Sequence, residues 1–583
     1  MRRSNYDKSP VIPIGGAELC FAGWSAIATQ LNAARVICIE CYPGVDVERV
    51  AAELVPKLGP RSVFRASNVY KSPDRIRQML HQFLGDDPVF GRMNGLTLED
   101  WFDDARADRM RSEIASLAQS HPIVVLGTGA ALLAPEADLL VYVDMARWEI
   151  QMRFRRGELG NLGCGNVEAS FAEKYKCGYF AEWRAADRLK KQLLRRADFI
   201  LDTNDNSTPK LISGDTSRAA LQSATQRPFR VVPYFDPGPW GGRWMEEVCD
   251  LPKDVPNHAW CFDCVPEENS LLLGFGDQRF EIPAIDLVFL QPKELLGDPV
   301  HARFGTEFPI RFDFLDTMGG GNLSLQVHPL TEYIQDQFGM HYTQDESYYL
   351  LDAEPGACVY LGLKEGVEQE KVADDLWRAQ AGGYTFPAEQ YVNQFPARKH
   401  DHFLIPAGTI HCSGKDSMVL EISATPYIFT FKLWDWNRLG LDGRPRPIHL
   451  DHGLANIQWD RTTAWVRKNL VNAVRPVGSG EGWTEEVTGL HDREFIETRR
   501  HWFTGKVLHD THGGVNVLNL VQGEEAIVES PQNCFAPFVV HYAETFIVPA
   551  AVGPYTIRPH GSAVGTECAT IKAFVRTGPG AEG

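Results

Sequence analysis

Four side chains of types that bind metal ions stand in or beside predicted β-strands. In Leu323–Pro329 (LSLQVHP) apolar and polar residues alternate, so the period of two in a strand places Gln326 and His328 on one face. Glu346 begins the run ESYYLL, far enough along for a helix and a returning strand, and His411 ends FLIPAGTIH after a Pro-containing turn. Two imidazoles, a carboxylate and an amide oxygen form a mixed set that suits zinc, with one position open for water or substrate.

Each of these residues alone also has a purely structural explanation. A single histidine on a strand is more often a hydrogen-bonded core residue than a metal ligand. The hypothesis of a metal site therefore depends on the four residues occurring together and on the sequence around them.

The surrounding sequence resembles one enzyme family. The segments GNLSLQVHP, ESYY, GLKEGV, IPAGTIH, VLEIS and TFKLWDWNR occur in the order and approximate spacing of type I mannose-6-phosphate isomerases. Upstream, YFDPGPWGGRW resembles the family's opening Trp-Gly-Gly segment, and FPIRFDFLD resembles its strand before the zinc motif. The resemblance extends over about residues 228–583.

The resemblance implies a cupin (jelly-roll) fold with one zinc ion per chain. Motif by motif, it implies that the zinc ligands are Gln326, His328, Glu346 and His411. The implied activity is an aldose–ketose isomerisation, as between mannose 6-phosphate and fructose 6-phosphate, in which a proton moves between C1 and C2 through an enediol. The implied partner is a small-molecule sugar or sugar phosphate.

Two further residues take part in the implied chemistry. Glu421 in VLEIS corresponds to the family's acidic residue after the last ligand histidine, and is either the base or a residue that supports the ligands. Lys432 in TFKLWDWNR stands where the family usually has an arginine that faces the sugar. Because Pro426 shifts the alternation between them, the sequence leaves open whether Lys432 faces the cavity or the solvent.

Other positions depart from the family's pattern. Gln344 stands two residues before Glu346, where a lysine is usual, and Asp313 in FPIRFDFLD replaces another lysine. Together with Lys432 in place of arginine, these changes remove or weaken two or three cations. They predict weaker recognition of a dianionic sugar phosphate, so the identity of the sugar stays open.

The first 227 residues predict a different architecture. Short β-branched runs at Arg35–Glu40, Pro122–Leu126 and Leu139–Asp144 alternate with helical patterns such as Val47–Leu58. Strands interleaved with helices predict a parallel α/β sheet that is covered on both faces.

The turn after the first of these strands is where a nucleotide-binding enzyme would carry its phosphate loop. The layout resembles the nucleoside and uridine kinase branch of P-loop proteins, with Arg153, Arg155 and Arg156 where such kinases carry lid arginines. In that alignment Val47 takes the place of the loop lysine and Glu48 that of the Ser/Thr. We interpret the region as a degenerate P-loop domain with a structural or regulatory role. The arginines fit a solvated helix face equally well.

Beyond about residue 228, short alternating runs between Gly, Pro, Asn and Asp predict antiparallel sheets, with a helical interlude near Pro329–Phe338. Pro and Gly concentrate in TQRPFRVVPYFDPGPWGG, and a second break is expected within residues 470–490. The expected domains are a degenerate P-loop domain (1–227), a zinc-binding cupin isomerase domain (228–480) and a second cupin-like β domain (481–583).

Composition limits the classes of function. The 583 residues are 44% hydrophobic and 23% charged, as in soluble globular proteins. The formal net charge of −18 repels nucleic acid and anionic lipid, so neither is an expected partner. No run approaches the about 18 apolar residues of a membrane span, and we expect a cytoplasmic protein. The twelve cysteines are scattered, and Cys261 and Cys264 are interpreted as two strand-borne thiols.

Three functions fit these observations. The leading one is a zinc-dependent sugar or sugar-phosphate isomerase. The second is a non-catalytic zinc cupin that binds a carbohydrate and signals through the kinase-like domain. The third, a bifunctional kinase and isomerase, is disfavoured by Val47 and Glu48.

Overall fold

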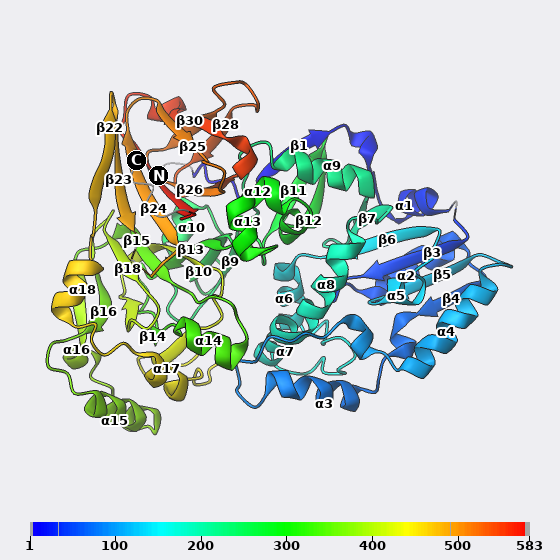
Figure 1. Cartoon of the computed structure of the whole chain (residues 1–583), viewed down its shortest axis with the longest axis horizontal. Helices are drawn as coiled ribbons and strands as arrows, with labels where there is room; N and C mark the ends of the chain where they lie inside the picture. Colours follow the sequence, from blue (N-terminus) through cyan, green and yellow to red (C-terminus); the bar gives the residue numbers. More distant parts are fainter. Residues whose placement is uncertain (1–3, 33, 490, 492, 578–583) are drawn as a thin grey trace. The chain divides into compact units, whose positions relative to one another are not determined.

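The computed structural model of the chain (Figure 1) describes residues 4–32, 34–489, 491 and 493–577. It divides into two compact units. The α/β unit consists of Val11–Ala224 and Pro266–Gln291. The β unit consists of the residues up to Pro10, Thr225–Val265 and the chain from Pro292 onward. Among the described residues, no helix is long and apolar enough to cross a membrane.

The α/β unit is built on a seven-stranded sheet. Its spatial order is β2 (Cys20–Ala22), β8 (Lys210–Ser213), β7 (Phe199–Asp202), β6 (Leu139–Asp144), β3 (Val36–Cys41), β5 (Ile123–Gly127) and β4 (Ser62–Arg65). The last five run parallel to one another, whereas β8 and β2 pair antiparallel at one edge. All residues of β3 and β5 are buried, as expected for a sheet covered on both faces. The predicted parallel α/β sheet is confirmed.

Helices connect these strands and cover the sheet. They are α1 (Trp24–Leu31), α2 (Val47–Leu58), α3 (Pro73–Leu84), α4 (Asp104–Leu117), α5 (Ala130–Leu133), α6 (Arg147–Arg155), α7 (Phe171–Cys177), α8 (Trp183–Leu193) and α9 (Gly214–Ala224), with a π-helical turn at Gly178–Glu182. The predicted helix Val47–Leu58 is confirmed residue for residue. Its N-cap Asp46 accepts a hydrogen bond from the Arg49 amide, and Gly59 ends it with a positive φ of 57°.

A segment from beyond the predicted boundary at residue 227 also belongs to the α/β unit. Residues 266–291 form β11 (Ser270–Phe275), β12 (Gln278–Pro283) and α11 (Ile285–Leu290), and β11 pairs with β1 (Val11–Gly15) in a three-stranded sheet. Buried Lys190 on α8 holds α11 through Asp286 at 2.6 Å and also pairs with Asp144 at 2.9 Å. Local alternation predicts a strand but not its partner sheet, so the contiguous domain 1–227 is corrected to this discontinuous unit.

The β unit begins with a sandwich of two sheets. One is six-stranded in the order β18 (His402–Ile405), β15 (Glu346–Ala353), β20 (Ser417–Ala424), β13 (Ile310–Asp316), β10 (Trp260–Cys264) and β9 (Tyr234–Asp236). The other is five-stranded in the order β17 (Val392–Pro396), β16 (Cys358–Leu363), β19 (His411–Ser413), β14 (Leu325–Val327) and β21 (Phe431–Trp434). Every strand pair in them is antiparallel, as predicted.

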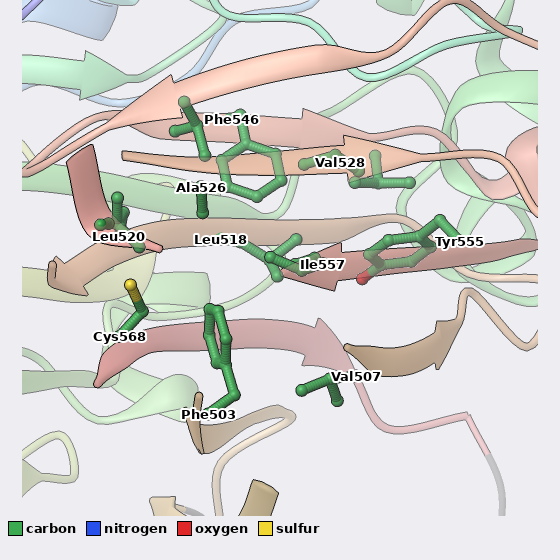
Figure 2. Packing of buried hydrophobic residues seen from close by; sticks show 13 residues of the cluster. Phe503, Val507, Leu518, Leu520, Ala526, Val528, Phe546, Tyr555, Ile557 and Cys568 are labelled. Atoms are coloured by element: carbon green, nitrogen blue, oxygen red, sulfur yellow. The ribbon is translucent and has the colours of Figure 1, made fainter. Parts of the chain in front are cut away.

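A second sandwich follows in the same unit. Its sheets have the orders β22 (Arg475–Gly480), β23 (Trp483–Gly489), β24 (Ile496–Phe503), β31 (Cys568–Val575), β26 (Asn516–Gln522), β29 (Thr545–Val548), and β25 (Val507–Asp510), β30 (Pro554–Pro559), β27 (Glu525–Glu529), β28 (Phe538–His541). Figure 2 shows its apolar core, which contains Phe503 of β24 and Leu518 of β26 from one sheet and Ile557 of β30 from the other. Both sandwiches belong to one compact unit, and the predicted boundary at 480/481 falls between the paired strands β22 and β23 of a single sheet.

Short helices complete the β unit: α10 (Trp244–Val248), α12 (Pro292–Leu296), α13 (Asp298–Phe304), α14 (Thr331–Phe338), α15 (Gln369–Gln380), α16 (Ala388–Tyr391), α17 (Leu450–Asn456) and α18 (Thr463–Asn469). The predicted helical interlude near Pro329–Phe338 is confirmed by α14. Cys261 and Cys264 are both buried on strand β10, as interpreted from the sequence.

The loop after β3, where the sequence resembles a phosphate loop, is filled by the chain itself. A Cβ on Gly44 would lie 2.5 Å from Ile150 of α6, and Arg153 donates to the Gly44 carbonyl at 3.2 Å. The Asp46 carboxylate already caps the first turn of α2. Of the predicted lid arginines, Arg153 pairs with Glu149 at 2.9 Å. These contacts leave the first turn of α2 little capacity for a phosphate, although the P-loop ancestry itself stays a prediction.

We therefore expect the full-length chain not to bind Mg-ATP tightly. Phosphate binding at a helix N-terminus needs free backbone amides and a nearby cation, and here a carboxylate takes the amide of Arg49 while Val47 supplies no charge. Calorimetric titration of the chain with Mg-ATP should give no heat of binding in the micromolar range. A micromolar dissociation constant would contradict the interpretation of this domain.

Candidate metal centre

Strand register brings three predicted site residues to one face of the five-stranded sheet. Gln326 of β14 lies opposite His411 of β19 on one side and opposite Lys432 of β21 on the other. Residues directly opposite each other in antiparallel strands project on the same face. His328 follows β14 two residues after Gln326. The structure therefore brings together what the alternation in LSLQVHP predicts.

Glu346 enters the same space from the facing sheet, as the first residue of β15. Its Oε1 lies 2.8 Å from His411 Nε2, and its Oε2 lies 3.1 Å from His328 Nε2. The side-chain amide of Gln326 ends 3.2 Å from His411 Nε2. Within the described part of the chain, His328, Glu346 and His411 are the one trio of His, Cys, Asp or Glu side chains whose ligand atoms lie within 4.8 Å of one another.

The two imidazoles are oriented for metal binding. His328 Nδ1 lies 3.2 Å from the Phe429 carbonyl oxygen, and His411 Nδ1 lies 2.9 Å from the Thr409 carbonyl oxygen. A proton on each Nδ1 satisfies these carbonyls and turns both Nε2 lone pairs toward Glu346. In the structure His328 Nε2 and Glu346 Oε1 are buried without an aligned hydrogen-bond partner among the described residues. A cation between them would satisfy both, so the donor set fits zinc.

Electrostatics keep the Glu346 carboxylate ionised. Burial alone would raise the pKa of Glu346, but the positive charges of protonated His328 and His411 outweigh burial, and the pKa lies well below its usual value. When both imidazoles are neutral, a bound cation would supply this positive charge instead. A carboxylate that remains ionised in a buried position is the form that binds a divalent cation.

Glu421 lies on β20 beside the trio, opposite Tyr348 of β15. Its Oε1 accepts hydrogen bonds from Gln344 at 3.1 Å and from Ser423 at 2.9 Å. Gln344 also donates to Glu346 Oε2 at 3.1 Å, so one amide group joins the two carboxylates. Burial, followed by the charges of Asp313 and Glu346, raises the pKa of Glu421 well above its usual value.

A cation that the sequence analysis missed lies beside Glu421. Arg311 on β13 pairs with Asp313 at 2.5 Å and with Glu421 at 3.3 Å. The sequence comparison counted Asp313 as a lost lysine, but Arg311 restores a positive charge two residues earlier on the same strand face. The alternation in FPIRFDFLD contains the signal, since it places residues 311 and 313 side by side.

The register with Gln326 places Lys432 on the ligand face, which favours the cavity-facing alternative left open by the sequence. Burial lowers the pKa of Lys432 to about 7; Arg446 and Arg438 lower it too, while Asp435 opposes them. Its role in the reaction stays a prediction.

Two more arginines gather next to Lys432, and the sequence analysis did not single them out. Arg446 donates to Asp435 at 3.0 Å and to the Ser324 hydroxyl at 3.1 Å. Arg438 pairs with the same Asp435 carboxylate at 2.5 Å. Two guanidinium groups therefore share one carboxylate beside the candidate ligand Gln326. The spacing of these arginines from Lys432 along the chain does not indicate that they lie near it, because Arg446 reaches the site from a loop.

The sequence is similar at low identity to type I mannose-6-phosphate isomerases. A mannose-6-phosphate isomerase of Streptococcus mutans is 24% identical over 217 residues, which is 37% of this chain and 63% of that enzyme, a little under two thirds of its length. The probable mannose-6-phosphate isomerase GmuF of Bacillus subtilis is 21% identical over 332 residues, covering 57% of this chain and 96% of GmuF.

One solved structure and one family profile are also similar to parts of this chain. A solved mannose 6-phosphate isomerase from Bacillus subtilis superposes with a TM-score of 0.49 and 17% identity, covering 60% of this chain and 99% of that chain. Residues 23–226 match a family profile described as a domain of unknown function, DUF8485. That match coincides closely with the first part of the α/β unit.

Replacing His411 with alanine is expected to remove the zinc ion from this centre and so lower the zinc content of the wild type by one ion per chain. One of two imidazole ligands would be lost, and affinity should fall by at least about 100-fold. Elemental analysis after dialysis measures the metal content. His402→Ala is the matched control, because His402 is also fully buried but lies beside Tyr349, away from the trio. A zinc content of the His411 variant equal to that of the wild type would contradict the ligand assignment.

Proposed function

We propose that the chain is a zinc-dependent aldose–ketose isomerase that acts on mannose 6-phosphate or a related sugar phosphate. The observation that carries this proposal is the buried trio His328, Glu346 and His411 with an acid, Glu421, joined to it through Gln344. Similarity to mannose-6-phosphate isomerases supports it. We further propose that Gln326, His328, Glu346 and His411 hold the zinc.

The residues around the centre fit a proton transfer between neighbouring carbons. Zinc, when bound, would supply a Lewis acid that polarises the sugar's carbonyl and hydroxyl oxygens. Burial raises the pKa of Glu421 well above its usual value, so this carboxyl group can hold and return a proton. Lys432 and Arg311 can stabilise negative charge that develops on the sugar oxygens as the proton leaves carbon. The buried surroundings exclude water and strengthen both interactions.

The arginines beside Lys432 support a phosphorylated substrate. Arg438 and Arg446 carry two positive charges against the single negative charge of Asp435, and Lys432 adds a third positive charge when it is protonated. Planar guanidinium groups can contact two phosphate oxygens at once. This cluster offsets part of the loss at positions 313 and 344, and we propose that it receives the phosphate group.

A second candidate is a non-catalytic zinc cupin that binds a carbohydrate. The contacts of Arg311 favour it, because a cation paired with both Asp313 and Glu421 is less able to meet a substrate anion. A bound sugar that never exchanges its C2 proton would distinguish this protein from an isomerase.

Exchange of the C2 proton with solvent deuterium tests the proposed function. We expect the zinc-loaded chain to label mannose 6-phosphate at C2, and to label unphosphorylated mannose more slowly. Arg446→Gln should raise KM for the phosphorylated sugar by about tenfold, as expected for loss of a charge-assisted hydrogen bond. Arg444→Gln is the matched control, since Arg444 is exposed in the same loop. Absence of exchange with every hexose and pentose phosphate would leave the binding-protein alternative.

Lys432→Ala is expected to lower kcat on the exchanging sugar by at least about tenfold, because an electrostatic contact made in the transition state is lost. Zinc content should not change. Lys415→Ala provides the control, because the Lys415 side chain is 68% exposed. Equal kcat in the Lys432 variant and the wild type would show that the metal alone stabilises the charge.

A further inference from the structure

The second sandwich contains a pair of histidines that face its interior. On β24, Phe503 belongs to the apolar core, and His501 lies two residues earlier on the same face. On β25, Val507 belongs to the core, and His509 lies two residues later on the same face. Figure 2 shows Phe503 and Val507 at the apolar part of this interior. The strands belong to the two different sheets, so the histidines approach each other across the sandwich.

The two imidazoles are in contact and almost completely buried. Their ring centroids are 4.4 Å apart, and the exposed fractions are 2% for His501 and 3% for His509. His501 Nε2 lies 3.2 Å from Glu485 Oε1 on the neighbouring strand β23. His509 stacks on Tyr555 of β30 with centroids 5.0 Å apart and an interplanar angle of 11°. Both rings are therefore fixed in position.

Four polar atoms at this place have no hydrogen-bond partner among the described residues. They are Nδ1 of His501, both ring nitrogens of His509 and Oγ1 of Thr570, which lies opposite His501 on β31. Each buried unsatisfied polar group costs about 1–3 kcal/mol. A group of them in one place indicates an occupant that satisfies them together.

The chemistry of these atoms favours a cation as that occupant. If His501 donates its Nε2 proton to Glu485, its Nδ1 presents a lone pair to the interior. Neutral His509 presents one lone pair as well. A carboxylate that orients a histidine through its far nitrogen is the usual support of a metal-binding imidazole. Imidazole nitrogens are ligands for zinc, cobalt and nickel.

Charges around the pair are nearly balanced. Glu485 pairs with Arg499 at 3.1 Å, and Arg499 also pairs with Glu497 at 2.6 Å. Lys572, on β31 opposite Arg499, is buried, and its positive charge opposes a cation near the histidines. Asp510 follows His509 in the chain.

We propose that His501 and His509 together bind a divalent transition-metal ion inside the second sandwich, with water completing its coordination. One ligand comes from each sheet of the second sandwich, so the ion would join its six-stranded sheet to its four-stranded sheet and stabilise the fold. This site is separate from His328, Glu346 and His411 and goes beyond the proposed isomerase activity. It also changes the metal content expected from one ion to two per chain.

Metal stoichiometry of the full-length chain tests the proposal. After equilibration with micromolar zinc and gel filtration, the wild type should hold two zinc ions, His509→Ala one, and His411→Ala one. Because each variant removes a different ion, failure of the isomerase metal site and failure of this site give different results. His402→Ala should keep two ions and controls for loss of a buried imidazole. One zinc in the wild type, or two in the His509 variant, would overturn the proposal.

A second variant keeps the test decisive if His509→Ala does not fold. Lys572→Met removes the opposing charge and retains the length of the side chain, so it should tighten binding at this site by at least about threefold in cobalt titrations followed by absorption. Cobalt should raise the melting temperature of this variant more than that of the wild type. Weaker cobalt binding by the variant would contradict the proposal. Stabilisation of the wild type but not the variant by inorganic phosphate would also contradict it, because it would show that the site takes an anion.

Discussion

The candidate metal centre depends on strand register in two facing sheets. Gln326 and His411 share a face because β14 and β19 pair in one register, and Glu346 meets them because it is the first residue of β15 in the opposite sheet. A shift of one residue along β14 would turn Gln326 to the other face and bring Leu325 or Val327 into the site. The burial of these two apolar residues therefore fixes the register on which the ligand positions depend.

The sequence predicts those parts of the structure that depend on local periodicity. Alternation in LSLQVHP places Gln326 and His328 together, and the period of 3.6 predicts α2 at its observed bounds. Periodicity does not predict which strands pair. Residues 266–291 read as β-strands of the second half of the chain, but β11 pairs with β1, and Asp286 joins the buried ion pairs of Lys190. Both contacts link residues far apart in sequence.

The net charge of the site was predicted less well, because it also depends on which residues the fold brings together in space. Comparison position by position found that lysines are replaced at 313 and 344, and therefore predicted a loss of positive charge. The structure brings Arg311 from the same strand, and Arg446 from a loop, into the neighbourhood of the site. The electrostatic potential of a cavity is a sum over all nearby groups. Replacement of a charge at one position is therefore informative only when its neighbours in space are known.

Gln344 has a further consequence for the proton balance of the site. Two buried carboxylates, Glu346 and Glu421, accept hydrogen bonds from its amide, and like charges so close to each other cannot both ionise without cost. His328 and His411 hold Glu346 in the ionised form, so the cost falls on Glu421. A lysine at position 344 would lower the pKa of both carboxyl groups, whereas a neutral amide leaves Glu421 with a higher affinity for its proton. The replacement of lysine by glutamine therefore changes which group can carry the proton, and it is compatible with acid–base chemistry at this centre.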